Sequence, residues 1–343
     1  MELLGISEIA KLAGITRQAV SNWRNRYRDF PEPTYELVSG PVWKRDDIEQ
    51  WLKSREVEMT KTISFINLKG GVGKTTSTVA IAEFLAEEHK KRVLVVDLDP
   101  QTNATIALIT EDVWQEKDQK GQTLLQLFKD KLGKTNVFNV EEAIIKGVSN
   151  LHGGIRRLSL LPSSLGLIEI QDQLALIPGG SFYAVSPVNI LKAALQPVLP
   201  DYDYVLIDCP PNLGIVTLNG ISISTGYVIP VIPDILSTYG IPQILDRVEA
   251  FGKMSGTDVI PKGIIVSKFR SQSKLHNSRV RQLRRQADRG DLPPIFETVV
   301  PEAAQIAEAV DVGAAVQTLR QKYGYGNNYT VYSELAKEFL TKC

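Results

Sequence analysis

Short apolar runs alternate with helical segments over most of the chain. The clearest runs are rich in β-branched residues and lie at 62–67, 92–97, 204–208, 227–232 and 263–267. Runs of this length that are apolar throughout are typical of parallel strands buried on both faces of a sheet. We therefore predict an α/β domain built on a doubly wound, mostly parallel sheet. The more polar stretch 112–150 is expected to add helices at its periphery.

The N-terminal residues have a different pattern. Residues 6–25 predict two short helices separated by a turn, as in a helix-turn-helix. Ser7 and Thr16 are expected to cap the two helices, because a hydroxyl at that position can accept a hydrogen bond from a free backbone N–H. The expected apolar core of the pair consists of Ile9, Leu12, Ile15 and Trp23.

The second of these helices carries side chains suited to DNA. Arginine and amide side chains can bond base edges and phosphates in a major groove. The side chains expected to face DNA are Arg17, Gln18, Ser21, Asn22 and Arg24. Residues 9–27 contain no acidic side chain that would oppose such binding. The alternative is a small helical domain that binds another protein.

The segment after the helix pair predicts a hairpin over 35–42 and a closing helix over 46–53. Together with the helix pair, these elements resemble the winged domain of MerR-like regulators. The resemblance implies a winged helix-turn-helix DNA-binding domain over 1–56. A charged linker is then expected over 57–61, and the α/β domain over 62–343.

Composition and charge exclude several classes of protein. The 343 residues carry no formal net charge, so affinity for nucleic acid must come from local patches. Cys209 and Cys343 are the only cysteines, too few for a disulfide framework, a zinc site or an iron–sulfur cluster. No apolar run approaches the roughly 18 residues of a membrane span, and the N-terminus is charged where a signal peptide is apolar. We expect a cytoplasmic protein.

A glycine-rich loop follows the first predicted strand. Residues 68–76 read LKGGVGKTT and lead directly into a helical pattern. Glycines in this position let backbone N–H groups surround phosphate oxygens, and the helix N-terminus adds positive potential. Lys74 can reach the β- and γ-phosphates, and the Thr75 hydroxyl can ligate Mg²⁺. The residues expected to bind nucleotide are Lys69, Gly70, Gly71, Val72, Gly73, Lys74, Thr75 and Thr76.

The loop departs from the standard phosphate-binding pattern in one respect. The first glycine of G-x-x-x-x-G-K-[ST] would fall on Leu68, and a second lysine, Lys69, follows it. This arrangement resembles the deviant Walker motif of the ParA/MinD ATPases. The resemblance implies that Lys69 is catalytic and reaches the partner's phosphates across an ATP-bound sandwich dimer. A cation placed in this way acts on the transferred phosphoryl group as an arginine finger does.

Carboxylates follow two of the predicted strands. Asp97 ends the run at 92–97, Asp99 follows it two residues later, and Asp208 ends the run at 204–208. Ligands in such sheets bind beyond the carboxyl ends of strands, so these acids are expected to face the loop. By resemblance to the same family, Asp99 orients the attacking water. Asp208 and Thr75 hold Mg²⁺, and Asp97 supports the magnesium shell or the loop.

The resemblance continues through 150–167, 227–241 and 297–310, and it implies that Pro301 contacts the nucleotide. Guanine-specific P-loop proteins carry N-K-x-D near a strand end. The corresponding stretch here, 267–270, reads SKFR and lacks the aspartate that reads the base. We therefore expect ATP with Mg²⁺ rather than GTP.

A second basic segment lies near the C-terminus. Nine lysines or arginines and one acid occur between Lys262 and Arg289, and 271–290 predicts a helix. Opposite charges are missing from the neighbouring helical positions that usually offset such an excess. In ParA proteins the matching region binds DNA without sequence preference; a solvated charged face is the alternative. The candidate contacts are Lys274, Arg279, Arg281, Arg284 and Arg285.

Three functions remain open. The first is a nucleoid-associated DNA partition ATPase that is stimulated by a ParB-like, centromere-binding partner. Its N-terminal domain is expected to bind its own promoter or a nearby site for autoregulation. The second is a MinD-like ATPase that positions cargo at a membrane. The balanced charges of 332–343 argue against this, because they favour a helix packed on the core over a basic amphipathic membrane helix. The third is a transcription regulator that uses nucleotide with little hydrolysis.

Overall fold

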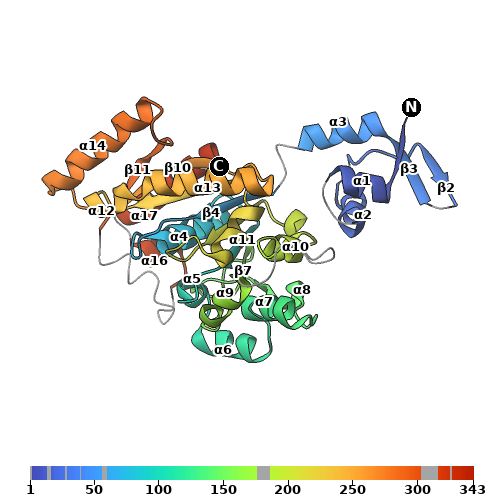
Figure 1. Cartoon of the computed structure of the whole chain (residues 1–343), viewed down its shortest axis with the longest axis horizontal. Coiled ribbons are helices and arrows are strands. Elements are labelled where there is room, and N and C mark those ends of the chain that lie inside the picture. Colours follow the sequence, from blue (N-terminus) through green and yellow to red (C-terminus); the bar gives the residue numbers. More distant parts are fainter. Residues whose placement is uncertain are drawn as a thin grey trace. The chain divides into compact units, whose positions relative to one another are not determined.

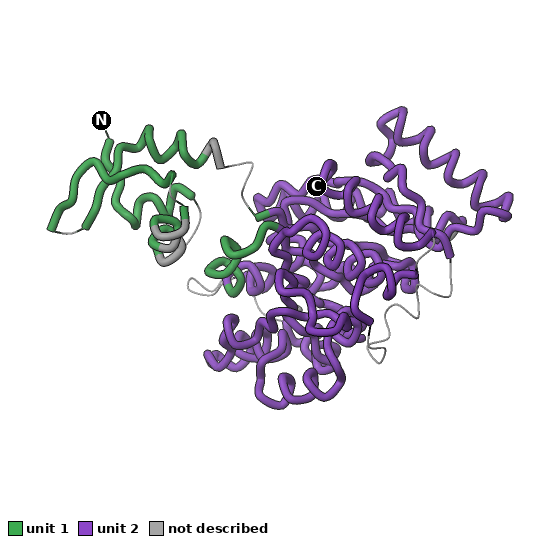
Figure 2. Tube along the Cα trace, turned by 180° about the vertical axis from the view of Figure 1, so that it is seen from behind, with its two compact units in different colours: residues 1–60, 194–203 green, residues 61–193, 204–343 purple. Residues whose placement is uncertain are grey.

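The computed structural model describes residues 2–13, 17–27, 29–38, 40–55, 60–175, 186–302, 316–324 and 327–343. Within these ranges the side chains of Gln18, Ala19, Asn22, Asn25, Arg26, 53–55, Asp172, Ala175 and Leu236 are not described. The chain divides into two compact units. The first comprises 1–60 with 194–203, and the second comprises 61–193 with 204–343 (Figure 2).

The second unit is built on an eight-stranded sheet in the order β11-β10-β9-β4-β8-β5-β7-β6. The strands are β4 (Lys61–Phe65), β5 (Val93–Asp97), β6 (Ile145–Lys146), β7 (Leu158–Leu161), β8 (Tyr204–Asp208), β9 (Gly226–Val231), β10 (Ile260–Phe269) and β11 (Ile295–Pro301). All neighbouring pairs are parallel except β6 with β7. The mostly parallel α/β fold and its five predicted strands are confirmed.

Helices cover both faces of this sheet (Figure 1). The connection from β4 to β5 runs in one direction across the sheet, whereas those from β8 through β9 to β10 and β11 run in the other. Right-handed crossovers therefore place their helices on opposite faces. The helices are α4 (Lys74–Glu87), α5 (Asn103–Leu108), α6 (Glu111–Gln119), α7 (Leu124–Gly133), α8 (Val140–Ala143), α9 (Leu167–Ala175), α10 (Ile190–Leu195), α11 (Ile215–Ile223), α12 (Ile235–Tyr239), α13 (Ile241–Ser255), α14 (Lys274–Asp288), α16 (Leu319–Tyr323) and α17 (Asn327–Lys342). Helices α6, α7 and α8 confirm the helical prediction for 112–150.

The C-terminal helix α17 packs on the sheet beside α4, as its apolar stripe predicts. The predicted stripe of Tyr332, Leu335, Ala336 and Phe339 is fully buried. The Phe339 ring stacks on Phe65 of the central strand β4, with ring centroids 6.1 Å apart. Among the described residues, no helix is long and apolar enough to cross a membrane.

The first unit is a three-stranded antiparallel sheet packed with three helices. Its elements are β1 (Leu3–Gly5), α1 (Ile6–Leu12), α2 (Arg17–Arg26), β2 (Tyr35–Leu37), β3 (Gly40–Lys44) and α3 (Arg45–Arg55), with the strand order β1-β3-β2. The core includes Trp23, Phe30, Trp43 and Trp51, whose rings meet edge to face or tilted. Residues 194–203, with the short 3-10 helix η1 (Leu199–Asp201), also belong to this unit.

Two predictions for the helix pair are wrong. Helix α1 begins at Ile6, so Gly5 rather than Ser7 is its N-cap, and the Glu8 carboxylate accepts the Gly5 N–H at 3.1 Å. Leu12, expected in the core, is 38% exposed because α1 ends there and the next residue begins the turn. Thr16 and Ile15 lie outside the described residues.

A buried ion pair connects α4 to α16 in the second unit. The Glu83 carboxylate accepts hydrogen bonds from the Lys322 ammonium at 2.8 Å and the Tyr323 hydroxyl at 2.8 Å. Both charged side chains have essentially no exposed surface. A buried carboxylate is costly unless it keeps its partners, so this pair constrains where α16 lies on α4.

Lys322→Met should therefore destabilise the protein strongly. It leaves Glu83 buried without its cation, and we expect the free energy of unfolding to fall by about 3–5 kcal/mol. Lys337→Met, the control, removes an exposed partner of Glu334 and should change the free energy of unfolding far less. Urea denaturation of both variants measures the difference. Equal losses would show that the buried pair contributes no more than a surface one.

Candidate functional site

Three central strands end at the same level. Phe65 of β4 pairs with Asp208 of β8, and Asp208 pairs in turn with Asp97 of β5. The loop of residues 66–73 leaves β4 at this level and leads into α4. The two carboxylates and the loop therefore share the carboxyl edge of the sheet, where open α/β folds bind ligands.

The loop backbone is shaped for an anion. Gly71 and Gly73 have φ values of +73° and +81°, in the left-handed region that favours glycine. Space is open beside Gly70 and Gly71, where an added Cβ would meet nothing within 4 Å. Gly73 caps α4 directly, so the free N–H groups of Thr75 and Thr76 begin the helix. Backbone N–H groups and the helix dipole together favour a phosphate here.

Lys74 lies inside the loop. Its ammonium donates to the carbonyl oxygens of Asn67 and Lys69, both at 3.3 Å, and its side chain is buried. Burial lowers the pKa of Lys74, against the opposing attraction of Asp208 and Asp99. The cation is therefore held within its own loop and faces the acids at the strand ends.

The Asp208 carboxylate has hydrogen-bond partners for only part of its capacity. One carboxylate oxygen accepts the Thr75 hydroxyl at 2.6 Å, whereas the other, Oδ1, is buried and has no hydrogen-bond partner among the described residues. Burial, and then repulsion from Asp97, raises the pKa of Asp208 well above its ordinary value. A divalent cation would supply the missing partner and charge. Thr75 and Asp208 fit Mg²⁺, which keeps most of its waters and needs few protein ligands.

Asp97 is fully buried and holds the segment that follows it. Its Oδ1 accepts the Asp99 N–H at 3.1 Å, and its Oδ2 accepts the N–H and hydroxyl of Thr105 at 2.8 and 2.7 Å. Burial raises the pKa of Asp97 to about 7, although the hydrogen bonds from Thr105 oppose that rise. These contacts show Asp97 supporting the loop before α5.

Hydrogen bonds hold both the carboxylate and the backbone carbonyl of Asp99. Its carboxylate accepts the Gln101 N–H at 3.0 Å, and its carbonyl oxygen accepts the Ser163 hydroxyl at 2.8 Å. The side chain is 7% exposed. Asp99 thus lies in a hydrogen-bonded turn, and its carboxylate interacts electrostatically with Lys74.

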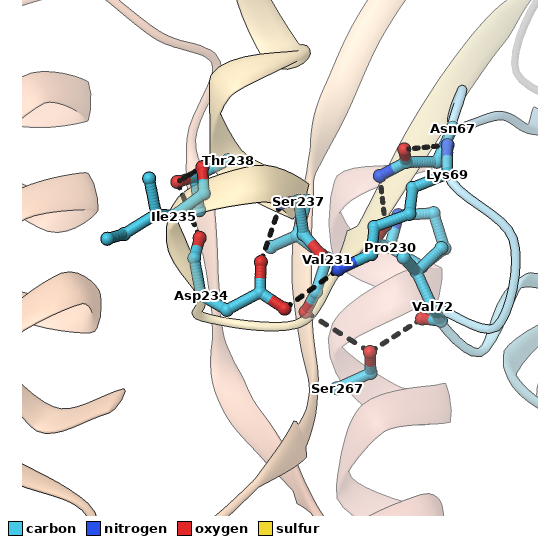
Figure 3. Close-up of polar contacts among 10 residues, drawn as sticks. All are labelled: Asn67, Lys69, Val72, Pro230, Val231, Asp234, Ile235, Ser237, Thr238 and Ser267. Carbon is cyan, nitrogen blue, oxygen red and sulfur yellow. Dashed lines mark hydrogen bonds and ion pairs between the residues drawn. The ribbon is translucent and has the colours of Figure 1, made fainter. Parts of the chain in front are cut away.

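The Lys69 side chain pairs with a residue outside the loop and is 36% exposed. Its ammonium forms an ion pair with Asp234 at 2.9 Å, at the start of α12 (Figure 3). The Asn67 side chain accepts the Lys69 N–H and donates to the Pro230 carbonyl, and so fastens the loop to the end of β9. Asp234 was not predicted from the sequence as a site residue, although it lies three residues beyond the end of β9.

Ser267 is another missed residue that shapes the loop. Its hydroxyl lies 2.6 Å from the Val72 carbonyl and 3.1 Å from the Val231 carbonyl, and it is buried. It contacts the place where an added Cβ of Gly73 would lie. Pro301 ends β11 opposite Phe269 on the same edge of the sheet. Residues 303–315, which continue the segment implied in nucleotide binding, lie outside the described part of the chain.

Helix α14 carries the basic segment predicted between β10 and β11. Lys274, Arg281 and Arg285 are exposed and spaced for one face of the helix. Arg284 forms an ion pair with Glu297 of β11, a partner that does not belong to the helix. Arg279 donates to Gln282 at 2.7 Å. Fewer cations of α14 are therefore available to DNA than the sequence indicates.

Helix α2 carries the candidate DNA side chains of the first unit. Arg17 is exposed, and Ser21 donates to its carbonyl oxygen at 3.2 Å. The Arg24 guanidinium lies over the Trp43 ring, 5.2 Å from its centroid, and 3.6 Å from Glu36. The side chains of Gln18 and Asn22 lie outside the described residues.

Comparison with known proteins identifies the family. The AAA domain family model matches residues 60–259, more than half of the chain. The sporulation initiation inhibitor protein Soj of Bacillus subtilis is 30% identical over 82% of this chain and 98% of its own length. The chromosome-partitioning ATPase Soj of Treponema pallidum is 29% identical over 83% and 98%.

A solved structure shows the same fold. Cobyrinic acid a,c-diamide synthase from Mycobacterium smegmatis, with bound ATP analogue and magnesium, superposes with a TM-score of 0.62. It is 24% identical, and the match covers 82% of this chain and 95% of the synthase. The relatives in sequence and the deviant loop with its two lysines agree: the chain belongs to the ParA/Soj/MinD-type AAA ATPase family.

Proposed function

We propose that the protein is an ATP-dependent DNA partition ATPase that works as a nucleotide-sandwich dimer. The observation that carries the proposal is the contrast between the two lysines of one loop. The Lys74 side chain is buried and bonded to its own loop, whereas the Lys69 side chain is partly exposed and pairs with Asp234 outside the loop. A cation in that position is available to a second copy of the chain, and the partition ATPases among the relatives support the same reading.

The site would bind ATP with Mg²⁺ through the loop and one strand end. The N–H groups of residues 70–76 and the Lys74 ammonium would hold the phosphates, and Pro301 would lie near the base. Thr75 and Asp208 would hold the ion, which neutralises charge on the phosphates, and Asp97 would keep the adjoining loop in place. Asp99 would orient the attacking water, and Lys69 of one protomer would stabilise charge on the phosphoryl group bound by its partner.

Dimer closure would also create the DNA-binding surface. The exposed cations Lys274, Arg281 and Arg285 on α14 suit phosphate contacts, which carry no sequence information. Arg279 and Arg284 would add less, because each already has a partner within the chain. Hydrolysis, stimulated by a ParB-like protein, would release the DNA. The protein would then be cytoplasmic and nucleoid-associated while ATP is bound.

The first unit is proposed as a winged helix-turn-helix that reads a specific site, such as the protein's own promoter. Helix α2 would enter the major groove, and the β2–β3 hairpin would form the wing. The exposed Arg17 supports this role. Arg24 is better placed to contact the backbone than a base, because it already packs on Trp43 of the hairpin.

A membrane-positioning function has less support. It needs a free amphipathic helix, whereas the apolar stripe of α17 is buried against the sheet. A regulator with little hydrolysis would have no need of an intact Lys69 and Asp99.

Alanine substitutions of Lys74 and Lys69 should impair different steps, ATP binding and hydrolysis respectively. Lys74→Ala removes a cation that binds phosphate within its own loop, so ATP affinity should fall by at least about tenfold. Lys69→Ala should keep most ATP binding, yet lower turnover by about 10³-fold, the lower range for an arginine finger. Binding of a fluorescent ATP analogue and release of phosphate measure the two effects. Normal hydrolysis by Lys69→Ala would exclude a catalytic role for this lysine.

Asp99→Ala should trap an ATP-bound dimer. The substitution removes the acid that orients water and leaves the phosphate-binding loop intact, so closure can occur without the chemical step. Size-exclusion chromatography with light scattering, in ATP and Mg²⁺, should show a stable dimer. Asp112→Ala, on the peripheral helix α6, is the matched control and should behave as wild type. A monomeric Asp99→Ala protein would move the water-orienting role elsewhere.

The two DNA-binding surfaces should be separable. Arg17→Ala, Gln18→Ala and Asn22→Ala should each weaken binding to the specific site, by about 1–3 kcal/mol wherever the side chain makes a good bidentate bond to a base edge. Arg281→Ala with Arg285→Ala should instead weaken ATP-dependent binding to any duplex. The slope of log K against log salt should drop by about one for each phosphate that is no longer neutralised.

Gel shifts with random and upstream-region duplexes, with and without ATP, measure both effects. Lys253→Ala on α13 is the control, since this lysine is exposed but lies outside the proposed surface. If the α14 variants bind random duplex as wild type does, α14 is only a solvated face. The regulator interpretation would then be favoured.

A further inference from the structure

The position of Lys69 in the single chain depends on one carboxylate. Asp234 Oδ2 accepts the Lys69 ammonium at 2.9 Å, and Asp234 Oδ1 accepts the Ser237 N–H at 2.6 Å (Figure 3). Asp234 is the N-cap of α12, so its carboxylate is oriented by the helix as well as by the lysine. The two side chains are 36% and 28% exposed, and the pair is therefore partly shielded from water.

Hydrogen bonds connect the backbone segments on either side of this pair. Asn67 joins the start of the loop to Pro230, and the Ser267 hydroxyl lies between the carbonyls of Val72 and Val231. These contacts fix the end of β9 to the loop on both sides. Asp234 follows β9 by three residues and therefore has little freedom to move away from Lys69. Burial acts to raise the pKa of Asp234, but the hydrogen bonds from Ser237 and the Lys69 cation together lower it below its ordinary value, so the carboxylate stays charged.

A Lys69 ammonium that contacted both this carboxylate and a partner's phosphates would bring two anions close together. The phosphates carry several negative charges, and the capped Asp234 carboxylate would repel them if it stayed beside the ammonium. Closure of a sandwich dimer must therefore break the Lys69–Asp234 pair in both protomers. We propose that Asp234 is a positioning residue that holds Lys69 in a resting orientation and raises the concentration of protein needed for ATP-dependent dimerisation. This inference rests on the proposed function of Lys69.

The size of the effect follows from the exposure of the pair. Ion pairs at a partly exposed site contribute about 0.2–1 kcal/mol each, which corresponds to about 1.4- to 5-fold in an equilibrium constant. Two pairs break for each dimer formed, so removing the carboxylate should tighten the dimer by about 2- to 25-fold. The nucleotide affinity of the monomer should change little, because Lys74 rather than Lys69 lies within the loop.

The test uses the full chain with Asp234→Asn. Asparagine is also a good N-cap, so α12 should keep its cap while the negative charge is lost. Asp234→Ser, which caps equally well, gives an independent variant if the first folds poorly. Glu249→Gln is the matched control, because it removes one exposed acid that pairs with Lys253 on α13, away from the loop.

Two measurements distinguish the Lys69–Asp234 contact in the monomer from its effect on dimerisation. In nucleotide-free protein, a limiting dose of an amine-reactive reagent followed by mass spectrometry should label Lys69 about 1.4- to 5-fold faster in the Asp234 variants than in wild type. With a non-hydrolysable ATP analogue and Mg²⁺, analytical ultracentrifugation should show the tighter dimer. The Glu249→Gln protein should match wild type in both measurements.

Each outcome decides the proposal. Unchanged labelling of Lys69 would show that Asp234 does not hold it, and the proposal would be overturned. Faster labelling with an unchanged dimer dissociation constant would overturn the positioning role alone. If wild type and variants all stay monomeric with the analogue, the sandwich-dimer function itself fails, and the role of Asp234 with it.

Discussion

A parallel sheet buried on both faces has room for polar chemistry only at its strand ends. The central strands of the second unit are mostly apolar, as expected where helices cover both faces of a sheet. The register then decides which polar residues meet, and it brings Phe65, Asp208 and Asp97 side by side. The loop that leaves β4 at this level is thereby placed against two carboxylates. The candidate nucleotide site depends on this one constraint.

The same burial leaves the carboxylates of the site with too few partners for their negative charge. Burial raises the pKa values of Asp97 and Asp208, and Lys74 is the cation held within the loop beside them. Asp97 is compensated by hydrogen bonds from Thr105 and Asp99, and this compensation orders the turn that contains Asp99. Asp208 keeps one buried oxygen without a partner in the described structure. Two neighbouring acids thus have different tasks, one supporting a loop and one suited to a metal ion.

Structural elements that arise from a local sequence pattern could be predicted, and elements without such a pattern could not. The central strands and α4 follow from continuous apolar runs and a glycine loop, so they could be predicted. Strand β7 has only four residues, and β11 is an edge strand with exposed polar positions such as Glu297, so neither gives a clear apolar run. The predicted cap at Ser7 failed because the preceding strand ends at Gly5, and α1 begins directly after it.

Ion pairs between residues that lie far apart in the chain could not be predicted from the sequence. Arg284 finds Glu297 on a neighbouring strand, and Lys69 finds Asp234 at a separation of 165 residues. The spacing of charges along a helix reveals only partners on that same helix. The sequence therefore indicated more unpaired cations on α14 than the structure shows. A strand-end rule would have brought Asp234 to the carboxyl edge beside Asp97 and Asp208, but not to Lys69 in particular.

The fold itself does not assign the function. A diamide synthase with a bound ATP analogue superposes on 82% of this chain, so this fold serves more than one chemistry. What favours a dimer is a cation that its own loop does not use. Lys74 completes the charge of the loop from inside, and Lys69 is left at the exposed rim against a single carboxylate. An ammonium there gains more from a polyanionic phosphate than from one partly solvated acid, because the attraction grows with the charge it faces. In the proposed sandwich dimer, a second copy of the same loop would supply that gain.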